Sequence, residues 1–179
     1  NFLKEQPDLN FHNPVVRKQM LSECEFWLER GVDGFRLDTV NFYFHDQELR
    51  DNPPRDQSKI STGLQVDTDF PYTMQAHIYD KSRPENIDFL KDLRALMDRY
   101  GATMTIGEIG DDDPYKLAVE YTDGANLLHT TYNTHLLAGT HESKITRDTI
   151  EIPLKDFAKY PGDGWPSWAF SNHDVVRSV

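Results

Sequence analysis

Cysteine is almost absent from this chain, which holds Cys24 alone among its 179 residues. A single cysteine excludes an internal disulfide and a cysteine metal cluster. Because Cys24 has apolar neighbours at helical spacing, we expect it to be a buried, inert thiol. The chain also lacks an apolar run long enough to cross a bilayer and a recognisable signal peptide. From these absences we expect a cytoplasmic protein with no membrane partner.

Positive charge is also in deficit, with 19 basic against 30 acidic residues and a formal net charge of −11. This imbalance argues against nucleic acid or an anionic membrane surface as a partner. It suits a neutral or cationic ligand, although most of the charges serve solubility. The length is enough for one domain with a sizeable core.

What the chain does contain is an alternation of helical and extended patterns. Asn13 followed by Pro14 is typical of a helix start, and Gly31 of a helix end. The patterns predict helices over residues 14–31, 84–101 and 115–121 and after Pro153, and strands over residues 35–38, 102–108, 126–131 and 168–171. Alternation of this kind builds parallel strands covered by helices, so the sequence predicts an α/β fold.

Residues 41–80 interrupt the alternation, because no sustained period runs through them. Pro53, Pro54, Gly63 and Pro71 punctuate the stretch. A loop of this length in a compact domain indicates function or disorder. Its six aromatic side chains favour an ordered loop that lies over another part of the molecule.

Three predicted strands end in, or lead to, an acid: Asp38, Glu108 and Asp174. In a parallel barrel all strand carboxyl ends meet at one rim, so these acids become neighbours. Clustered carboxylates repel one another and are best explained by chemistry that uses unequal protonation. We expect Arg36 to keep Asp38 ionised, while Glu108, with less cationic company, holds its proton. Glycoside hydrolysis requires that division, although a purely structural Arg36–Asp38 pair stays open as an alternative.

Two other clusters of polar residues contain types that bind metals, but neither supports a metal site. The acids at residues 111–113 suggest calcium, but Asp113 before Pro114 is better explained as a helix N-cap. The other group shows no metal-ligand spacing and is interpreted as a solvated loop: His135, His141 and Glu142. We therefore predict no metal ligand in this chain.

Several motifs, in order along the chain, carry a resemblance to a known family. They are Gly34-Phe35-Arg36-Leu37-Asp38, Gly107-Glu108 and Phe170-Ser171-Asn172-His173-Asp174, preceded by Gln6-Pro7-Asp8-Leu9-Asn10. The first three resemble segments of the α-amylase superfamily, glycoside hydrolase family 13. The motif at residues 6–10 and the stretch at residues 46–54 are similar to its α-glucosidase and oligo-1,6-glucosidase branch.

The resemblance implies a partial (β/α)8 TIM barrel. Residues 1–179 would be a fragment of the catalytic barrel domain, contributing about strands four to seven with their helices and a long βα loop at about 41–80. The remaining strands, an inserted domain and a C-terminal β-domain fall outside this chain. We therefore expect the isolated fragment to be inactive and prone to aggregate.

The same resemblance implies roles for individual residues. Asp38 matches the nucleophile, Glu108 the general acid/base, and Asp174 the third acid, which stabilises the transition state. Arg36 matches the residue that orients the nucleophile, and His173 the histidine that bonds glucose hydroxyls. The implied activity is retaining hydrolysis of terminal α-1,4-linked glucose from small α-glucosides such as maltose. It needs no cofactor, although calcium could bind through parts of the protein outside this chain.

Thr39, directly after the proposed nucleophile, bears on the linkage that is cut. In the branch that the chain resembles, Val there accompanies cleavage of α-1,6 bonds and Thr a preference for α-1,4 bonds. A Thr that only packs at the strand end is the alternative. Other functions also stay open: an α-1,6-glucosidase, a glucosyl transferase or isomerase, or a non-catalytic homologue used as a binding or transporter subunit. The three acids argue against the non-catalytic homologue.

Overall fold

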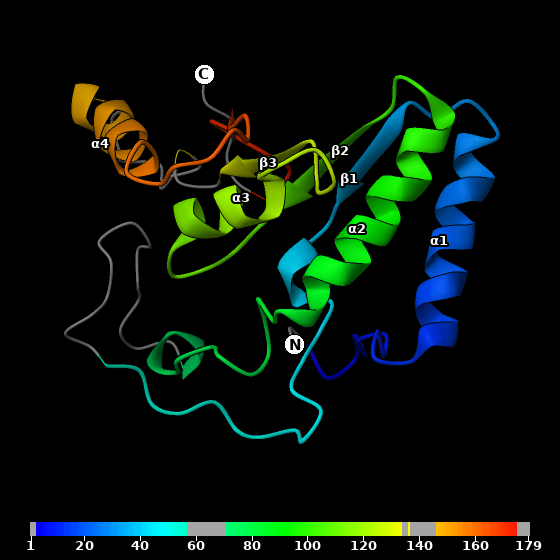
Figure 1. Ribbon diagram of the computed structural model, residues 1–179. Helices are drawn as coiled ribbons and strands as arrows, with labels where there is room; N and C mark the ends of the chain where they lie inside the picture. The colour runs from blue at the N-terminus through cyan, green and yellow to red at the C-terminus, as the bar shows by residue number, and fades with distance from the viewer. Residues whose placement is uncertain (1–2, 57–70, 134–135, 137–145, 175–179) are drawn as a thin grey trace.

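The computed structural model describes residues 3–56, 71–133, 136 and 146–174. Within them lies a sheet of four parallel strands: β1 (Gly34–Leu37), β2 (Met104–Glu108), β3 (Thr130–Asn133) and β4 (Ser167–Trp168). Each strand pairs with the next along the chain, so all four carboxyl ends reach one edge (Figure 1). The predicted α/β fold with parallel strands is confirmed, and the strand order is that of a partial (β/α)8 barrel.

Four α-helices accompany the sheet in the described part of the chain: α1 (Pro14–Leu28), α2 (Glu85–Met97), α3 (Pro114–Thr122) and α4 (Arg147–Phe157). Short 3-10 helices are η1 (Val40–Phe42), η3 (Pro71–Met74) and η4 (Asp98–Tyr100). Helices α1 and α2 lie side by side, and α3 packs against β3 (Figure 1). Each of these helices is too short or too polar to traverse a lipid bilayer.

Two helix starts follow the predicted capping chemistry. Asn13 Oδ1 accepts a hydrogen bond from the Val15 N–H at 2.9 Å, and Asp113 Oδ1 accepts one from the Lys116 N–H at 3.1 Å. In both helices a proline is the first residue, where its missing N–H removes no helical hydrogen bond. Both predicted N-caps are confirmed.

The predicted start of the last helix is wrong. Helix α4 begins at Arg147 and contains Pro153 in its interior. Thr146 and Thr149 form a capping box, in which each hydroxyl accepts a hydrogen bond from the other residue's N–H, at 3.1 and 3.3 Å. This cap satisfies two N–H groups at the helix start, while the proline removes one helical bond further along.

Two strand predictions are also corrected. Strand β3 covers Thr130–Asn133 instead of residues 126–131, because the chain first turns back toward α3. There the Leu128 N–H donates to the Tyr121 carbonyl at 3.0 Å, so Leu128 packs near the helix before the strand begins. Strand β4 is limited to Ser167–Trp168 instead of residues 168–171.

A hydrophobic core joins the buried sides of α2 and α3 to the sheet and the loops that follow β1 and β2. Gly107 lies within this packing, at the end of β2. A Cβ at Gly107 would stand 2.7 Å from Leu128 Cδ1 and 2.9 Å from Val40 Cγ1. Glycine therefore lets the end of β2 approach its neighbours closely, just before Glu108. Cys24 packs against the same core, and burial raises the pKa of its thiol, as expected of an inert cysteine.

The long segment after β1 is tied together at its base. The Asp46 N–H donates to the Tyr79 carbonyl at 2.6 Å, and the Asp46 carboxylate pairs with Arg50 at 2.5 Å and with Arg83 at 3.7 Å. Hydrogen bonds from Arg50 outweigh burial and hold the pKa of Asp46 well below its usual range. Two stretches separated by more than 30 residues are thus joined around one ionised carboxylate. Residues 57–70 lie outside the described part.

Candidate active site

The guanidinium of Arg36 joins two of the predicted catalytic acids. Its Nη1 is bonded to Asp38 Oδ1, and its Nη2 lies 2.7 Å from Glu108 Oε2. Arg36 lies on β1, Asp38 directly follows that strand, and Glu108 ends β2. One guanidinium bridges two carboxylates only when they lie close together, so the two acids are neighbours in space.

Glu108 is surrounded by donors. Besides Arg36, the Tyr132 hydroxyl donates to its Oε1 at 2.5 Å, and the Thr39 backbone N–H donates to its Oε2 at 3.2 Å. The Glu108 side chain is 14% exposed, whereas that of Asp38 is 72% exposed. The expectation that Glu108 has less cationic company than Asp38 is therefore wrong. Strand alternation put Arg36 beside Asp38, but the neighbouring strand also brings Glu108 within reach of the same guanidinium.

The contacts around Arg36 set its charge and that of its neighbour. Burial works against the charge of Arg36, but hydrogen bonds with Tyr132 and Asp38 and the charge of Glu108 outweigh it and raise the pKa of Arg36. Burial, and next the hydrogen bond to Glu108, raise the pKa of Tyr132 to about 12. At neutral pH the site therefore contains a fixed cation and a phenol that keeps its proton.

Thr39 adopts a left-handed backbone conformation, with φ 39° and ψ 48°. This region is unfavourable for a β-branched residue and points to a local constraint. The turn directs the Thr39 N–H at Glu108 Oε2. The described contact of Thr39 with the site is thus made by its backbone, while the predicted role concerned its hydroxyl.

Asn41, which the sequence reasoning missed, connects the loops that follow the two acids. Its Nδ2 donates to the Gly110 carbonyl at 3.0 Å and to Ser82 Oγ at 2.9 Å, and its Oδ1 accepts from the Gly110 N–H at 3.1 Å. The side chain is fully buried. An amide between the apolar Val40 and Phe42 was the available signal, since a buried amide must have partners.

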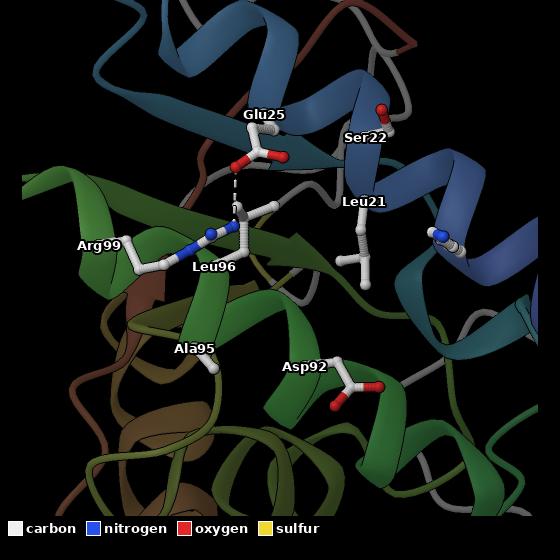
Figure 2. Close-up of a pocket in the computed structure, with 8 residues that line it drawn as sticks. Leu21, Ser22, Glu25, Asp92, Ala95, Leu96 and Arg99 are labelled. Carbon is white, nitrogen blue, oxygen red and sulfur yellow. Dashed lines mark hydrogen bonds and ion pairs between the residues drawn. The ribbon is translucent and has the colours of Figure 1, made fainter.

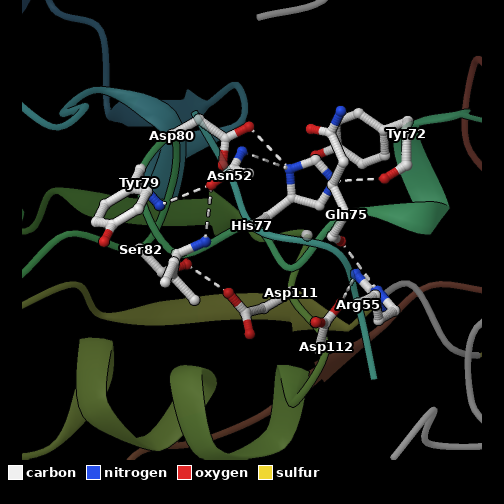
Figure 3. Close-up of polar contacts among 12 residues, drawn as sticks. Asn52, Arg55, Tyr72, Gln75, His77, Tyr79, Asp80, Ser82, Asp111 and Asp112 are labelled. Atoms are coloured by element: carbon white, nitrogen blue, oxygen red, sulfur yellow. Dashed lines mark hydrogen bonds and ion pairs between the residues drawn. The ribbon is translucent and has the colours of Figure 1, made fainter. Parts of the chain in front are cut away.

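A second set of polar contacts ties Arg55 in the long segment, and Ser82 just after it, to the loop between β2 and α3 (Figure 3). Ser82 Oγ donates to Asp111 Oδ2 at 2.5 Å, and Arg55 Nη2 lies 2.8 Å from Asp112 Oδ1. His77 stacks on Tyr72, with ring centroids 3.7 Å apart. Asp111 and Asp112 are therefore engaged by protein groups, and Asp113 caps α3.

His173 and Asp174 follow β4, which lies at the opposite edge of the described sheet from β1. Both are exposed, with His173 Nε2 3.5 Å from Asp174 Oδ2, and the Asp174 N–H donates to Asn172 Oδ1 at 2.9 Å. Among the described residues, neither is bonded to Arg36, Asp38 or Glu108. The residues of the predicted solvated loop, His135, His141 and Glu142, fall outside the described part.

Comparison with known proteins decides the family. The family model for the alpha-amylase catalytic domain matches residues 1–179. This chain belongs to the α-amylase family. The membership confirms the resemblance carried by the motifs, and with it the partial TIM barrel.

Individual members of the α-amylase family show what share of a full-length relative this chain corresponds to. A probable alpha-glucosidase of Rhizobium meliloti (strain 1021) is 50% identical over 182 residues, covering 100% of this chain and 32% of that protein. An oligo-1,6-glucosidase of Parageobacillus thermoglucosidasius is 31% identical over 188 residues, covering 99% of this chain and 31% of that protein. The crystal structure of the alpha-glucosyl transfer enzyme XgtA matches with a TM-score of 0.88 and 44% identity, over 99% of this chain and 32% of that chain. The chain thus spans about a third of the length of the curated relatives it matches.

Among the described residues of this α-amylase-family segment, one hollow reaches the site and another lies away from it. A cavity of about 330 Å³ lies between α1, α2 and the end of β1, with Asp38 and Thr39 at its edge and Phe11, Leu37 and Phe89 among its apolar walls. A groove of about 530 Å³ between α1 and α2 includes none of the predicted site residues (Figure 2). Across that groove Arg99 Nη2 donates to Glu25 Oε1 at 2.9 Å, and this surface ion pair links η4, which follows α2, to α1.

Proposed function

We propose that this chain is the catalytic segment of a retaining α-glucosidase that removes terminal α-1,4-linked glucose from small α-glucosides such as maltose. The observation that carries the proposal is the sharing of Arg36 by Asp38 and Glu108 at the carboxyl edge of the sheet. Relatives described as α-glucosidases support it. Residues 1–179 would be part of the barrel domain, with residues 41–80 as a long βα loop.

The proposed chemistry consists of two displacements. In the first, Asp38 attacks the anomeric carbon while Glu108 protonates the leaving oxygen. In the second, Glu108 takes a proton from water, whose oxygen bonds to the anomeric carbon as the ester to Asp38 breaks. The pair of carboxylates carries one negative charge before, between and after these steps, and Arg36 is placed to neutralise it on either acid. The two carboxylates and water suffice, so no cofactor is proposed.

Asp174 and His173 are proposed to bind the sugar in the complete protein. Asp174 would stabilise the transition state and hold sugar hydroxyls, and His173 would bond hydroxyls of the glucose that is released. Both follow β4, and a closed barrel would turn this strand end toward the end of β1. Relatives three times as long as this chain support a closed barrel around the segment.

Thr39 is proposed to favour α-1,4 linkages, because a hydroxyl next to Asp38 is able to hydrogen-bond a leaving sugar, while a methyl is not. Relatives include both an α-glucosidase and an oligo-1,6-glucosidase, so substrate comparison is the test. The complete protein should turn over maltose faster than isomaltose. Faster turnover of isomaltose would contradict the proposed linkage and leave the hydrolase proposal intact.

A second candidate function is transfer of glucose to an acceptor other than water. It is favoured by the structural match to XgtA, described as an alpha-glucosyl transfer enzyme. The same residues serve hydrolysis and transfer, because only the second displacement differs. Product analysis with maltose as donor and an alcohol as acceptor separates the two, since hydrolysis yields two glucose molecules per maltose and transfer yields one glucose and one glucoside.

The central experiment replaces Glu108 with glutamine in the complete protein. We expect Glu108→Gln to lower maltose turnover by about 10²–10⁴-fold, the usual contribution of a general acid/base. Glu120→Gln, at an exposed position on α3, is the control and should leave turnover unchanged. Wild-type protein that binds maltose without cleaving it would instead support the non-catalytic homologue.

A further inference from the structure

Tyr132 has a hydroxyl placed between the two charged groups that matter most at this site. Its oxygen accepts a hydrogen bond from Arg36 Nη2 at 2.8 Å, and its proton goes to Glu108 Oε1 at 2.5 Å. Tyr132 lies on β3 and pairs in register with Glu108 on β2. The side chain is largely buried, so the hydroxyl has a fixed position. Sequence reasoning did not single out this residue.

The direction of these hydrogen bonds follows from the chemistry of the partners. Arg36 has only donors, so the phenol oxygen accepts from it, and the single phenol proton is left for Glu108. The high pKa of Tyr132, about 12, keeps that proton in place over the working pH range. Glu108 Oε1 thus accepts a hydrogen bond from the Tyr132 hydroxyl. Its Oε2 contacts the Arg36 guanidinium and accepts a hydrogen bond from the Thr39 N–H.

A carboxylate with donors on both oxygens is stabilised in its ionised form and held in one orientation. The groups that face Glu108 from its neighbours are Arg36 on β1, Asp38 through that same guanidinium, and Tyr132 on β3. Of these, Arg36 serves both acids, whereas Tyr132 is bonded to Glu108 without a described bond to Asp38. Removing the Tyr132 hydroxyl therefore takes a direct hydrogen bond from Glu108 and no described one from Asp38, so its effect reports on the role of Glu108.

We infer that Tyr132 is a positioning residue for the general base, holding Glu108 as an oriented carboxylate for the second displacement. In that step one proton passes from water to Glu108, and the electron pair of the breaking ester bond returns to Asp38. Tyr132 neither gains nor loses a proton in this step, because its hydroxyl only donates a hydrogen bond to Glu108. This inference rests on the proposed glucosidase function.

The test is Tyr132→Phe in the complete protein, with p-nitrophenyl α-glucoside as substrate. This leaving group needs little protonation, so the first displacement should continue while the second slows. We expect kcat to fall about tenfold, the value of one hydrogen bond to a charged group. KM should fall with it, because the glucosyl-enzyme accumulates.

The pH profile provides a second readout, with maltose as substrate. Removing a hydrogen-bond donor to the Glu108 carboxylate should move the alkaline limb of kcat/KM to higher pH, because that limb reports the general acid/base. A residue that only supports the fold would lower the rate equally at every pH. An unshifted limb, together with a kcat and a KM that each equal the wild-type value, would overturn the inference.

Tyr121→Phe is the matched control. Tyr121 is buried on α3, where its hydroxyl accepts from Asn86 Nδ2 at 3.0 Å, away from the site residues. Its removal should cost stability without moving kcat, KM or the pH limb. If the wild-type protein shows no α-glucoside cleavage, the proposed function fails. If the wild type is active and Tyr132→Phe matches Tyr121→Phe, only the role of Tyr132 fails.

Discussion

The end of β1–β2 and the segment after β4 carry motifs of the same family but differ in how firmly the described chain holds them. β1 and β2 pair over four residues of each strand, and the acids at their ends share Arg36. β3 and β4 pair over two residues of each strand, and Asp174 beyond them is exposed. A strand-end side chain is therefore positioned by how fully its strand pairs with the next strand and not by its motif alone.

Apolar exposure shows the same contrast. Leu37, Val40 and Ile109 near the first two strand ends are buried in the core. Around β4, Trp165 is 81% exposed and Ile152 on α4 is 53% exposed. Exposed apolar groups of this size are typical of surfaces that other parts of a protein cover. The relatives, which are about three times as long, support that explanation for the second region.

The largest expected effect tests whether the two regions nevertheless act on one sugar, and the test removes one charge from each region of the complete protein. We expect Asp38→Asn and Asp174→Asn both to lower maltose turnover by more than about 10³-fold, because each acid acts on the same sugar in the proposed mechanism. Initial rates with maltose measure this. Asp156 on α4 pairs with Lys159 and is not placed in the site, so Asp156→Asn serves as control. Turnover preserved in Asp174→Asn would remove Asp174 from the catalytic set.

The free energy of unfolding should differ between variants of the two regions, because only the first region is firmly held. Asn41→Ala leaves the Gly110 amide and carbonyl without their buried partner, so we expect a loss of about 3 kcal/mol in the free energy of unfolding. Asn172→Ala, two residues before Asp174, should change it by less than about 0.5 kcal/mol. Denaturant unfolding of the complete protein provides both values. Equal losses would show that the two loops are held equally well.

The smallest expected effect concerns pH and the base of the long segment. The pKa of Asp46 is lowered on folding, so its ion pairs with Arg50 and Arg83 stabilise the folded state above a pH of about 4, the unfolded value. That contribution is lost as the pH falls toward the lower folded value. Thermal unfolding of Asp46→Asn should therefore lie below that of wild type at pH 7, with a gap that shrinks below about pH 4. Glu151→Gln, on exposed α4, should show a smaller gap at pH 7, and the reverse order would contradict this prediction.

Local patterns in the sequence were sufficient wherever a single element decided the outcome. Asn13 and Asp113 were identified as N-caps because capping depends on a side chain and the next few N–H groups. The start of α4 differs from the prediction because the Thr146 capping box begins the helix and Pro153 is accommodated inside it. The start of β3 was missed because the contact of Leu128 with α3 is not a local property.

The sequence by itself determined the family, the parallel α/β arrangement and the acids at the strand ends, because motifs, caps and hydrophobic period are properties of neighbouring residues. Only the tertiary structure decided which groups surround each acid. Arg36 reaches Glu108, Tyr132 donates to it, and Asn41 joins the two loops, each across more than 60 positions or between different strands. Strand register places such partners together, and a linear pattern contains no register.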